Sequence, residues 1–310
     1  MATLICYIAT ILLAILVASS FSLPHDEKVE EEVIPYPNPE EGNKFEGDII
    51  LDPDQMLAVI EQDSKRAGSQ FAAIRARNWK ANGMAIPIPY YINPALGYKA
   101  KGAIKAAVRE YIKHTCIKFQ EVDKRPLGKA HLHIVKKDGC WSHVGMYNNH
   151  EGQELSIGKG CEYKGVVTHE FGHALGLFHE QSRPDRDNYV EIILNNITPG
   201  RAGNFKRYST AMINSLGFKY DYESIMHYTN NAFAKRQGLI TIRTKNPAYQ
   251  NKIGNRHGLS KGDIAQLNKM YCSKLPCYNL ESAYQCWLWR PLCKVNSGVK
   301  RRCRVTCKLC

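Results

Sequence analysis

"VTHEFGHALGLFHE" spans Val167–Glu180 and places three histidines and two glutamates among apolar residues. His169 and His173 are four positions apart, about one helical turn, so a helix would project both imidazoles from the same face. Glu170 lies between them. In this spacing, H-E-x-x-H, two histidines bind zinc and the glutamate serves as general base. The stretch therefore predicts a helix with a metal-binding face.

A third histidine, His179, lies six positions after His173. At roughly 100° per residue, it would point away from the other two on a continuous helix. Gly176 stands between them, and glycine adopts left-handed conformations that end helices at little steric cost. We expect the chain to turn at Gly176, so that His169, His173 and His179 hold one Zn²⁺ per subunit with a fourth position open for water.

The shorter pattern H-E-x-x-H also occurs by chance in ordinary helices, whereas the extended form with Gly176 and His179 is far more specific. That form, followed downstream by a methionine turn, is the metzincin pattern. Met226 supplies the methionine within the stretch "YDYESIMHY". Glu180 directly follows the third histidine and precedes "QSRPDRD", which ends at Asp187.

Two further stretches carry the same likeness, "CWSHVGMYNNHEGQELSIGKGC" at Cys140–Cys161 and "LSKGDIAQLNKMYC" ending at Cys272. On these motifs the chain resembles the astacin family of metzincin proteases. The resemblance implies an α+β fold, a two-lobed, astacin-like metzincin catalytic domain with its cleft between the lobes. The upper lobe would hold a sheet and the zinc-binding helix, and the lower lobe would be more irregular.

The resemblance also implies a function, that of a secreted zinc endopeptidase made as a zymogen. Glu170 would take a proton from the zinc-activated water and pass it to the leaving amine of an internal peptide bond. Tyr228 would be a further zinc ligand at rest and would swing to stabilise the transition state. Met226 would form an apolar floor beneath the ligands. Glu180 would interact, through water, with the new N-terminus of the mature enzyme.

Two alternatives to this function remain at the level of sequence. One is an inert catalytic domain in a protein that acts by binding through its tail, and the other is a zinc enzyme that is not a peptidase. The complete set of three histidines and Glu170 argues against the first, and the position of Tyr228 argues against the second. The physiological role stays open among digestion, hatching, matrix processing and venom.

Residues 1–20 include the apolar run "LICYIATILLAILVA", followed by small residues. This pattern predicts a cleaved signal peptide and a secreted, extracellular protein. An uncleaved membrane anchor is the alternative, although the run is short for a span and no strongly cationic stretch follows it. No later segment is long and apolar enough to cross a bilayer.

Residues 21–66 have the composition of a pro-segment, with 13 Asp plus Glu against 4 Lys plus Arg. They end in the dibasic pair Lys65-Arg66, a processing site for an activating protease. Arg75 and Arg77 are competing sites, so the pro-segment extends to residue 66 or as far as residue 77. The catalytic domain is then expected to cover residues 67–273.

The pro-segment contains "FEGD" at Phe45–Asp48. This stretch is similar to the Phe-x-Gly-Asp motif of astacin pro-segments, and the resemblance makes Asp48 the zymogen switch. A carboxylate oxygen is a good zinc ligand, and it would displace the water from the open position. Gly47 would let the backbone pass close to the cleft. The alternative is a chance match in an acidic, irregular stretch.

The chain holds eleven cysteines, of which Cys6 falls in the signal peptide. The remaining ten suit five disulfides in an oxidising compartment, and their spacing alone leaves the connectivity open. Six of them crowd residues 277–310, which resemble the small ShKT module. Its loop "KVNSGVKRR" has no aromatic residue, which favours a docking or spacer role over channel block. The two resemblances imply the pairs Cys116–Cys272, Cys140–Cys161, Cys277–Cys310, Cys286–Cys303 and Cys293–Cys307.

Periodicity and composition predict several elements of the catalytic domain. Apolar and β-branched runs predict strands in "MAIPIPYYI", "AHLHIV" and "GLITIRT". Helical spacing predicts helices in "KAKGAIKAAVREYIKHTC" and "KGDIAQLNKMY". In the pro-segment, Asp54 is expected to cap a short helix with Met56, Leu57, Val59 and Ile60 on one side. His131 and His133 alternate as on a strand, and we leave them out of the metal site.

From residue 67 onward the chain carries 38 Lys plus Arg and 16 Asp plus Glu. This excess favours protein or peptide substrates that are acidic or bound to a polyanionic matrix, or it is simply a solvated surface. No nucleic-acid motif accompanies it. Asn196 begins an Asn-Ile-Thr triplet and is a glycosylation candidate, weakened by the Pro199 that follows.

Overall fold

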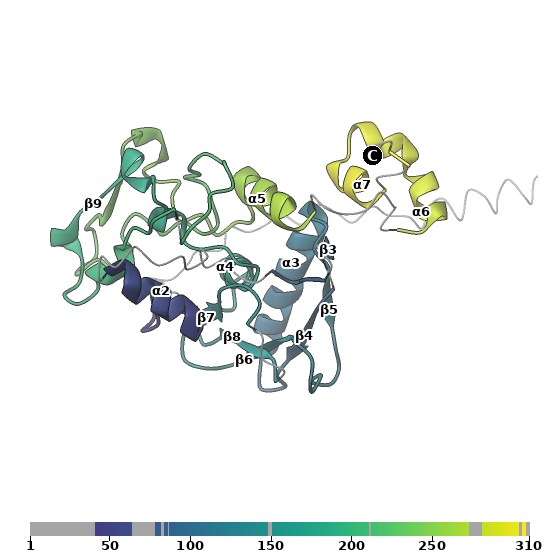
Figure 1. The fold of residues 1–310 in the computed structure, drawn as a ribbon, viewed down its shortest axis with the longest axis horizontal. Coiled ribbons are helices and arrows are strands. Elements are labelled where there is room, and N and C mark those ends of the chain that lie inside the picture. The colour runs from purple at the N-terminus through teal and green to yellow at the C-terminus, as the bar shows by residue number, and fades with distance from the viewer. Residues whose placement is uncertain are drawn as a thin grey trace, which may run out of the picture. The chain divides into compact units, whose positions relative to one another are not determined.

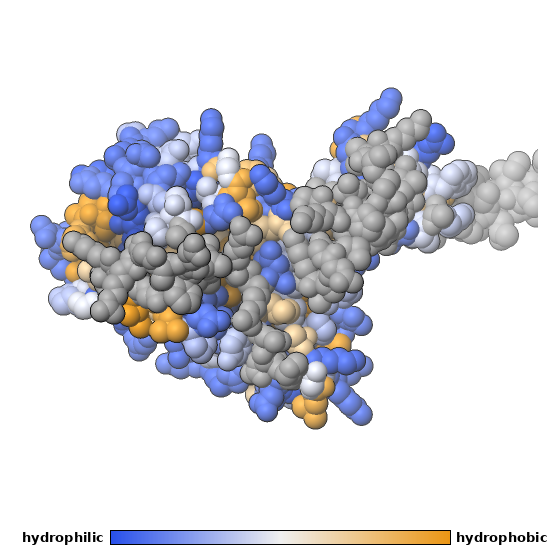
Figure 2. Space-filling view, in the orientation of Figure 1, coloured by the Kyte–Doolittle hydropathy of each residue, from blue (hydrophilic) through white to orange (hydrophobic). Residues whose placement is uncertain are grey.

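The computed structural model describes residues 41–63, 78–81, 84–85, 87–147, 151–210, 212–272, 281–303 and 306–307 (Figure 1). The predicted signal peptide, the start of the pro-segment and the three candidate processing sites lie outside these residues, as do Cys277 and Cys310. In the part described, no helix is long and apolar enough to span a membrane. The face drawn in Figure 2 is largely hydrophilic, with apolar side chains in separate patches.

The first lobe is built on a six-stranded sheet with the order β1-β7-β8-β6-β4-β5. Every neighbouring pair runs parallel except β7 and β8. The bounds are β1 Ile49–Ile50, β4 Ile88–Ile92, β5 Phe119–Glu121, β6 Leu132–Val135, β7 Cys140–His143 and β8 Gln153–Ile157. A separate short pair is formed by β2 Lys80–Ala81 and β3 Met84–Ala85. The predicted strands in this part of the chain are confirmed.

One strand of the sheet comes from the predicted pro-segment. Its two residues pair with β7 in parallel, with Ile49 opposite Ser142 and Ile50 opposite His143. The backbone N–H of Ser142 also donates to the carbonyl of Asp48 (2.9 Å). An edge strand offers unpaired backbone groups to any extended segment beside it. The predicted pro-segment therefore occupies the edge that β7 would otherwise present.

Helices α3 (Tyr98–His114) and α4 (Lys164–Ala174) pack together in the core of this lobe. The helical spacing that predicted α3 matches its buried face, which includes Ile104, Ala107 and Tyr111. The phenol of Tyr111 donates to the carbonyl of Thr168 in α4 (2.7 Å). Burying a Tyr ring is favourable when its hydroxyl finds such a partner. The zinc-motif helix is thus held by both apolar packing and a buried hydrogen bond.

The second lobe is more irregular, as the resemblance implies. It contains the antiparallel pair β9 (Val190–Ile192) and β10 (Ile242–Thr244), several single 3₁₀ turns and helix α5 (Lys261–Tyr271). A capping box starts α5, because Ser260 and Asp263 each bond the other's backbone N–H. A smaller apolar cluster around Phe205, Tyr228 and Phe233 forms the core of this lobe.

Helix α2 (Pro53–Asp63) lies in the predicted pro-segment, and its cap differs from our prediction. Asp52, rather than Asp54, accepts from the backbone N–H of Gln55 (2.8 Å), while the Gln55 side chain accepts from the N–H of Asp52 (3.0 Å). Proline fits the first helical position, so the cap falls on the residue before Pro53. The predicted apolar side is also wrong. Val59 is buried, whereas Met56, Leu57 and Ile60 are exposed.

Among the described residues, four disulfides join pairs that the resemblances imply, namely Cys116–Cys272, Cys140–Cys161, Cys286–Cys303 and Cys293–Cys307. The last two belong to the C-terminal module, which contains α6 (Ala283–Leu288) and α7 (Ser297–Arg302). Its small core is formed by two disulfide cysteines and Val299. A unit with so little apolar burial depends on covalent cross-links for its stability.

Candidate active site

The site begins at the end of α4, where the chain turns. Gly176 has φ +97°, the left-handed conformation that glycine adopts most easily. The backbone N–H of Leu177 then donates back to the carbonyl of Gly172 (3.0 Å) and closes the turn. The turn brings His179 back to the two histidines of the helix.

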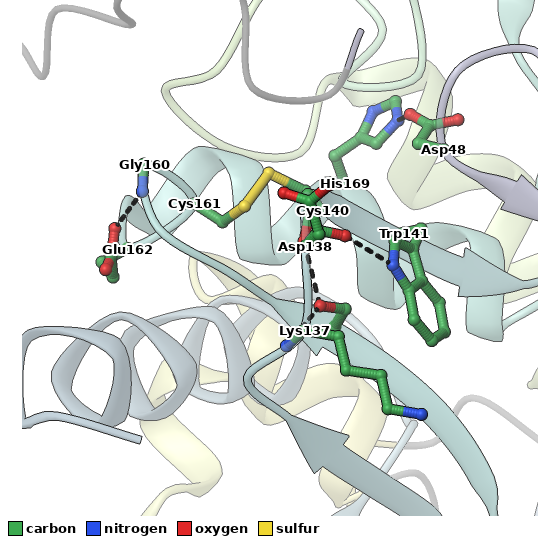
Figure 3. Close-up of a disulfide and its surroundings, with 11 residues drawn as sticks. Asp48, Lys137, Asp138, Cys140, Trp141, Gly160, Cys161, Glu162 and His169 are labelled. Atoms are coloured by element: carbon green, nitrogen blue, oxygen red, sulfur yellow. Dashed lines mark hydrogen bonds and ion pairs between the residues drawn. A yellow bond between two sulfur atoms is a disulfide. The ribbon is translucent and has the colours of Figure 1, made fainter. Parts of the chain in front are cut away.

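The three histidines meet a carboxylate from the predicted pro-segment. One ligand atom from each of His169, His173, His179 and Asp48 lies within 4.8 Å of the others, and all four residues are buried. The Nε2 atoms of the three histidines, in that order, lie 3.0, 3.5 and 3.3 Å from an oxygen of Asp48. Figure 3 shows the Asp48 carboxylate directed at the His169 ring.

Each imidazole has an acceptor at its Nδ1 atom, which leaves Nε2 facing the centre of the cluster. The three bonds are His169 Nδ1 to Ile225 O (2.8 Å), His173 Nδ1 to Leu177 O (2.8 Å) and His179 Nδ1 to Glu46 Oε2 (2.6 Å). Hydrogen bonds of this kind fix the tautomer and ring orientation of metal-ligating histidines. The geometry therefore directs three nitrogens and one oxygen toward a single point.

The chemistry of this donor set fits a zinc ion. The Nε2 atoms of His169 and His173 approach to 3.1 Å, and His179 Nε2 and one oxygen of Asp48 are buried without a hydrogen-bond partner among the described residues. A cation at the centre would satisfy all of these atoms. Burial would raise the pKa of Asp48, but the facing His179 and His173 hold it well below its usual value. Three imidazoles and a carboxylate form a tetrahedral set that suits zinc.

The predicted base, Glu170, is completely buried on α4, directly after the first ligand. Tyr228 lies with the centre of its ring 4.6 Å from that of His179. Its hydroxyl donates to the backbone carbonyl of Glu46, and its backbone N–H donates to the side-chain oxygen of Gln181 (3.0 Å). Burial raises the pKa of Tyr228 well above its usual value, and the carboxylate of Glu46 adds to this effect. The structure thus places the Tyr228 ring against a histidine of the cluster and buries Glu170 on the helix that carries the other two histidines.

Met226 is buried, and its sulfur lies against Gly172 of the zinc helix. The turn that carries it is held by two residues that sequence reasoning missed. Asp263 accepts from Ser224 Oγ (2.6 Å) and from the backbone N–H of Ile225 (2.9 Å). Arg256 donates to the carbonyl of Ile225 (2.9 Å), the same oxygen that binds His169. The capping motif "SKGD" predicts that Asp263 caps α5. No local motif predicts the contacts of Asp263 and Arg256 with the methionine turn.

Glu46 is the third residue that sequence reasoning missed, because only Phe45, Gly47 and Asp48 belong to the motif. It is buried and has a positive φ of +47°. Its carboxylate accepts from Ser182 Oγ (2.8 Å) as well as from His179. Two acidic residues of the predicted pro-segment therefore contact the ligand set.

Glu180 lies just outside the cluster. Its Oε1 accepts from the backbone N–H of Asp221 (2.7 Å) and lies 3.2 Å from an Arg183 nitrogen. Burial raises the pKa of Glu180 to about 8, despite the opposing effect of Arg183. A cavity of about 820 Å³ opens beside Asp221 and Tyr220.

The disulfide Cys140–Cys161 braces the strand beside the site (Figure 3). The neighbouring Trp141 donates its indole N–H to the carbonyl of Asp138 (3.0 Å).

His131 and His133 are buried and take no part in the cluster. Asn196 is half-buried, and its side-chain nitrogen donates to the carbonyl of Ile240 (2.7 Å).

Comparison with known proteins agrees with this geometry. The profile of the Astacin peptidase family matches residues 73–272. The chain is 39% identical over 250 residues to the zinc metalloproteinase dpy-31 of Caenorhabditis elegans, covering 77% of this chain and 42% of that protein. It is 39% identical over 229 residues to meprin A subunit alpha of Rattus norvegicus, covering 74% and 27%.

A solved structure extends the likeness to three dimensions. High choriolytic enzyme 1, a hatching enzyme zinc-protease from the medaka fish Oryzias latipes, superposes with a TM-score of 0.56 at 36% identity, covering 66% of this chain and 98% of that one. The chain spans less than half the length of the two longer relatives. On the matched profile over residues 73–272, the identities and the three-histidine site, the chain belongs to the astacin family.

Proposed function

We propose that the protein is a secreted zinc endopeptidase made as a zymogen, in which Asp48 holds the fourth metal position until the pro-segment is cut. The observation that carries the proposal is the buried cluster of three histidines and that one carboxylate. A bound zinc ion supplies Lewis acidity and lowers the pKa of its water to about 7. Removal of Asp48 opens the place that this water needs.

In the open site, Glu170 acts as the general base. It takes the proton of the attacking water and passes it to the nitrogen of the leaving amine. Its place directly after His169 on α4 and its complete burial support this role. A base held in place by packing loses little rotational freedom when the substrate binds.

Tyr228 stabilises the oxyanion of the transition state by donating its phenolic hydrogen bond. In the structure, the phenol of Tyr228 donates to the carbonyl of Glu46 instead. We infer that the pro-segment blocks the Tyr228 hydroxyl as well as the metal position. Departure of the pro-segment then releases the metal position, the phenol and the edge of β7 together. Inhibition through three contacts at once explains how a short segment silences the site.

Processing at the dibasic pair, or at Arg75 or Arg77, produces the mature enzyme, and this step calls for an activating protease. We assign the new N-terminus to the region of Glu180, with which it interacts through a water molecule. The cavity beside Asp221 offers room for such a segment. Residues 277–310 form an ShKT-like module with a docking or spacer role, and residues 1–20 direct secretion.

The direct test uses processed protein purified from a secreting host. It is expected to cleave casein and gelatin at internal bonds, to lose activity with a chelating phenanthroline, and to regain it when zinc is added. A non-chelating isomer of phenanthroline serves as the control. Processed, folded protein that cleaves no protein or peptide substrate would contradict the proposal.

A further inference from the structure

The C-terminal module exposes several large apolar side chains close together in the chain. Five of those exposed in the described part of the protein are Tyr284, Trp287, Leu288, Leu292 and Val295. Positions 284, 287 and 288 share one face of α6, because residues three and four apart are neighbours on a helix. The rings of Tyr284 and Trp287 lie 6.4 Å apart with 23° between their planes. Exposed apolar side chains that gather in this way mark an interaction surface.

The module does not need Trp287 for its own core. That core is formed by Cys286, Val299 and Cys303, and it is Trp289 that packs against it. The guanidinium of Arg302 lies 5.2 Å from the centre of the Trp289 ring and covers it from solvent. Trp287, in contrast, is 64% exposed. One tryptophan of the module therefore serves the fold, and the other is left for a contact outside the module.

Three cations lie beside the exposed tryptophan. A cavity of about 950 Å³ is lined by Trp287, Arg290, Lys294 and Lys300 and bounded by the Cys293–Cys307 disulfide. Among the described residues, none of the three cations has an ion-pair partner. Residues 277–310 hold seven Lys plus Arg and a single acidic residue, Glu281. The module thus combines exposed apolar side chains with an almost undiluted positive charge.

This combination matches the boundary of a lipid bilayer that carries anionic headgroups. Trp and Tyr rings are enriched at the headgroup level, and Leu side chains enter the acyl boundary beneath it. Lys and Arg are attracted to the anionic lipids of the same surface. A protein interface is expected to present charges of both signs to its partner. A sulfated glycan would pair with the cations but would leave Leu288, Leu292 and Val295 in water.

We propose that these five apolar side chains, together with Arg290, Lys294 and Lys300, form a docking face by which the C-terminal module binds anionic lipid membranes. Binding is peripheral, with the apolar side chains in the headgroup region and the cations at the lipid phosphates. The inference rests on the docking role proposed for the module and is independent of the peptidase chemistry. Docking would hold the catalytic domain beside proteins at the same membrane surface.

The test uses processed full-length enzyme and sucrose-loaded vesicles that are pelleted by centrifugation. One vesicle preparation is phosphatidylcholine alone, and the other contains equal parts of phosphatidylcholine and phosphatidylserine. The measured quantity is the partition coefficient of the enzyme between vesicles and buffer at a fixed salt concentration. Thermal unfolding of each variant, followed by circular dichroism, shows that it is folded.

Wild-type enzyme is expected to bind the anionic vesicles at least about tenfold more tightly than the neutral ones. Trp287→Ser should weaken binding to the anionic vesicles about tenfold, because the apolar surface of one large side chain is no longer buried. Arg290→Gln combined with Lys294→Gln should weaken it by about fivefold for each charge removed.

Two controls match these changes outside the module. Tyr98→Ser removes an aromatic side chain that is 81% exposed at the start of α3. Arg236→Gln combined with Lys245→Gln removes two exposed charges from the second lobe. Both controls should keep vesicle binding within about twofold of the wild type, because burial of apolar area and contact with anionic lipid are confined to the docking face.

Three results would overturn the docking face. The first is equal binding to neutral and anionic vesicles. The second is unchanged binding in Trp287→Ser, which would indicate adsorption of a basic protein without a defined site. The third is retention on immobilised heparin that depends on Trp287, without vesicle binding, which would make a sulfated glycan the partner. Peptide cleavage by the same samples tests the proposed function separately, because vesicle binding requires no catalysis.

Discussion

Gly172 and Met226 are in direct contact between the zinc helix and the turn beneath it. A Cβ atom added to Gly172 would lie 2.6 Å from the sulfur of Met226 and 3.4 Å from the hydroxyl of Tyr111. Only glycine fits this position without a shift of its neighbours. The methionine therefore supports the helix backbone directly beside the second zinc ligand.

The first prediction follows from this contact. Gly172→Ala should lower the free energy of unfolding by about 1–3 kcal/mol, because overpacking a close-packed core forces its neighbours apart. Thermal unfolding followed by circular dichroism measures the change. Gly102→Ala in α3 is the matched control, because a Cβ there meets no atom within 4 Å. It should leave stability equal or raise it by up to about 1 kcal/mol. Equal behaviour of the two variants would disprove the tight contact.

The second prediction separates the base from the metal ligands. Glu170→Gln keeps the side-chain volume but cannot accept the proton, so kcat should fall by about 10²–10⁴-fold. Zinc content should stay near one ion per chain, because Glu170 is not a ligand. Metal analysis and peptide cleavage on the same sample measure both quantities. A variant that cleaves at the wild-type rate, or one that loses its zinc, would contradict the assigned role.

The third prediction concerns the switch. Asp48→Ala, in a precursor whose processing sites are blocked, should show measurable peptidase activity, because the water can then enter the fourth metal position. The blocked parent should be silent on the same fluorogenic peptide. Asp54→Ala, on an exposed position of α2, is the control for loss of one negative charge from the pro-segment. Should the Asp48 variant stay as silent as its parent, Asp48 is not the switch.

The fourth prediction tests the support of the methionine turn. Asp263→Ala removes the acceptor for Ser224, for the N–H of Ile225 and for the N–H of Ser260. Three lost bonds leave buried donors unpaired, and we expect a loss of about 1–3 kcal/mol or more in unfolding free energy. Because Ile225 also orients His169, zinc affinity should weaken as well. Zinc competition with a fluorescent chelator measures this second effect. Unchanged zinc affinity would show that Asp263 serves only the cap of α5.

The fifth prediction separates the two modules. Ending the chain after Ser273 should leave cleavage of a small peptide largely intact, because every proposed catalytic residue precedes this point. Each of the two disulfides found in the catalytic part is closed within it. Steady-state kinetics of the truncated and full-length enzymes give the comparison. Complete loss of cleavage in a folded, zinc-loaded truncated enzyme would show that the modules depend on one another.

The sequence predicts the metal site well because its information is local. Helical spacing places His169 and His173 together, and Gly176 accounts for the turn to His179. The same local reasoning misplaced the cap of α2 at Asp54, since it did not use the preference of Pro53 for the first helical position. Asp263, Arg256 and Glu46 were missed for a different reason. Their contacts join segments far apart in the chain, and no short motif records such contacts.

The Cys116–Cys272 bond encloses a chain segment that carries all three histidines, Glu170 and Tyr228. A foreign protease that cuts one exposed loop within this segment would therefore not release a fragment. The nicked molecule would keep its mass, apart from one added water, and would migrate as a single band without reducing agent. Only reduction would separate the two pieces. Inactivation by a single internal cut would thus escape detection by size alone, and comparing gels with and without reductant is the way to recognise it.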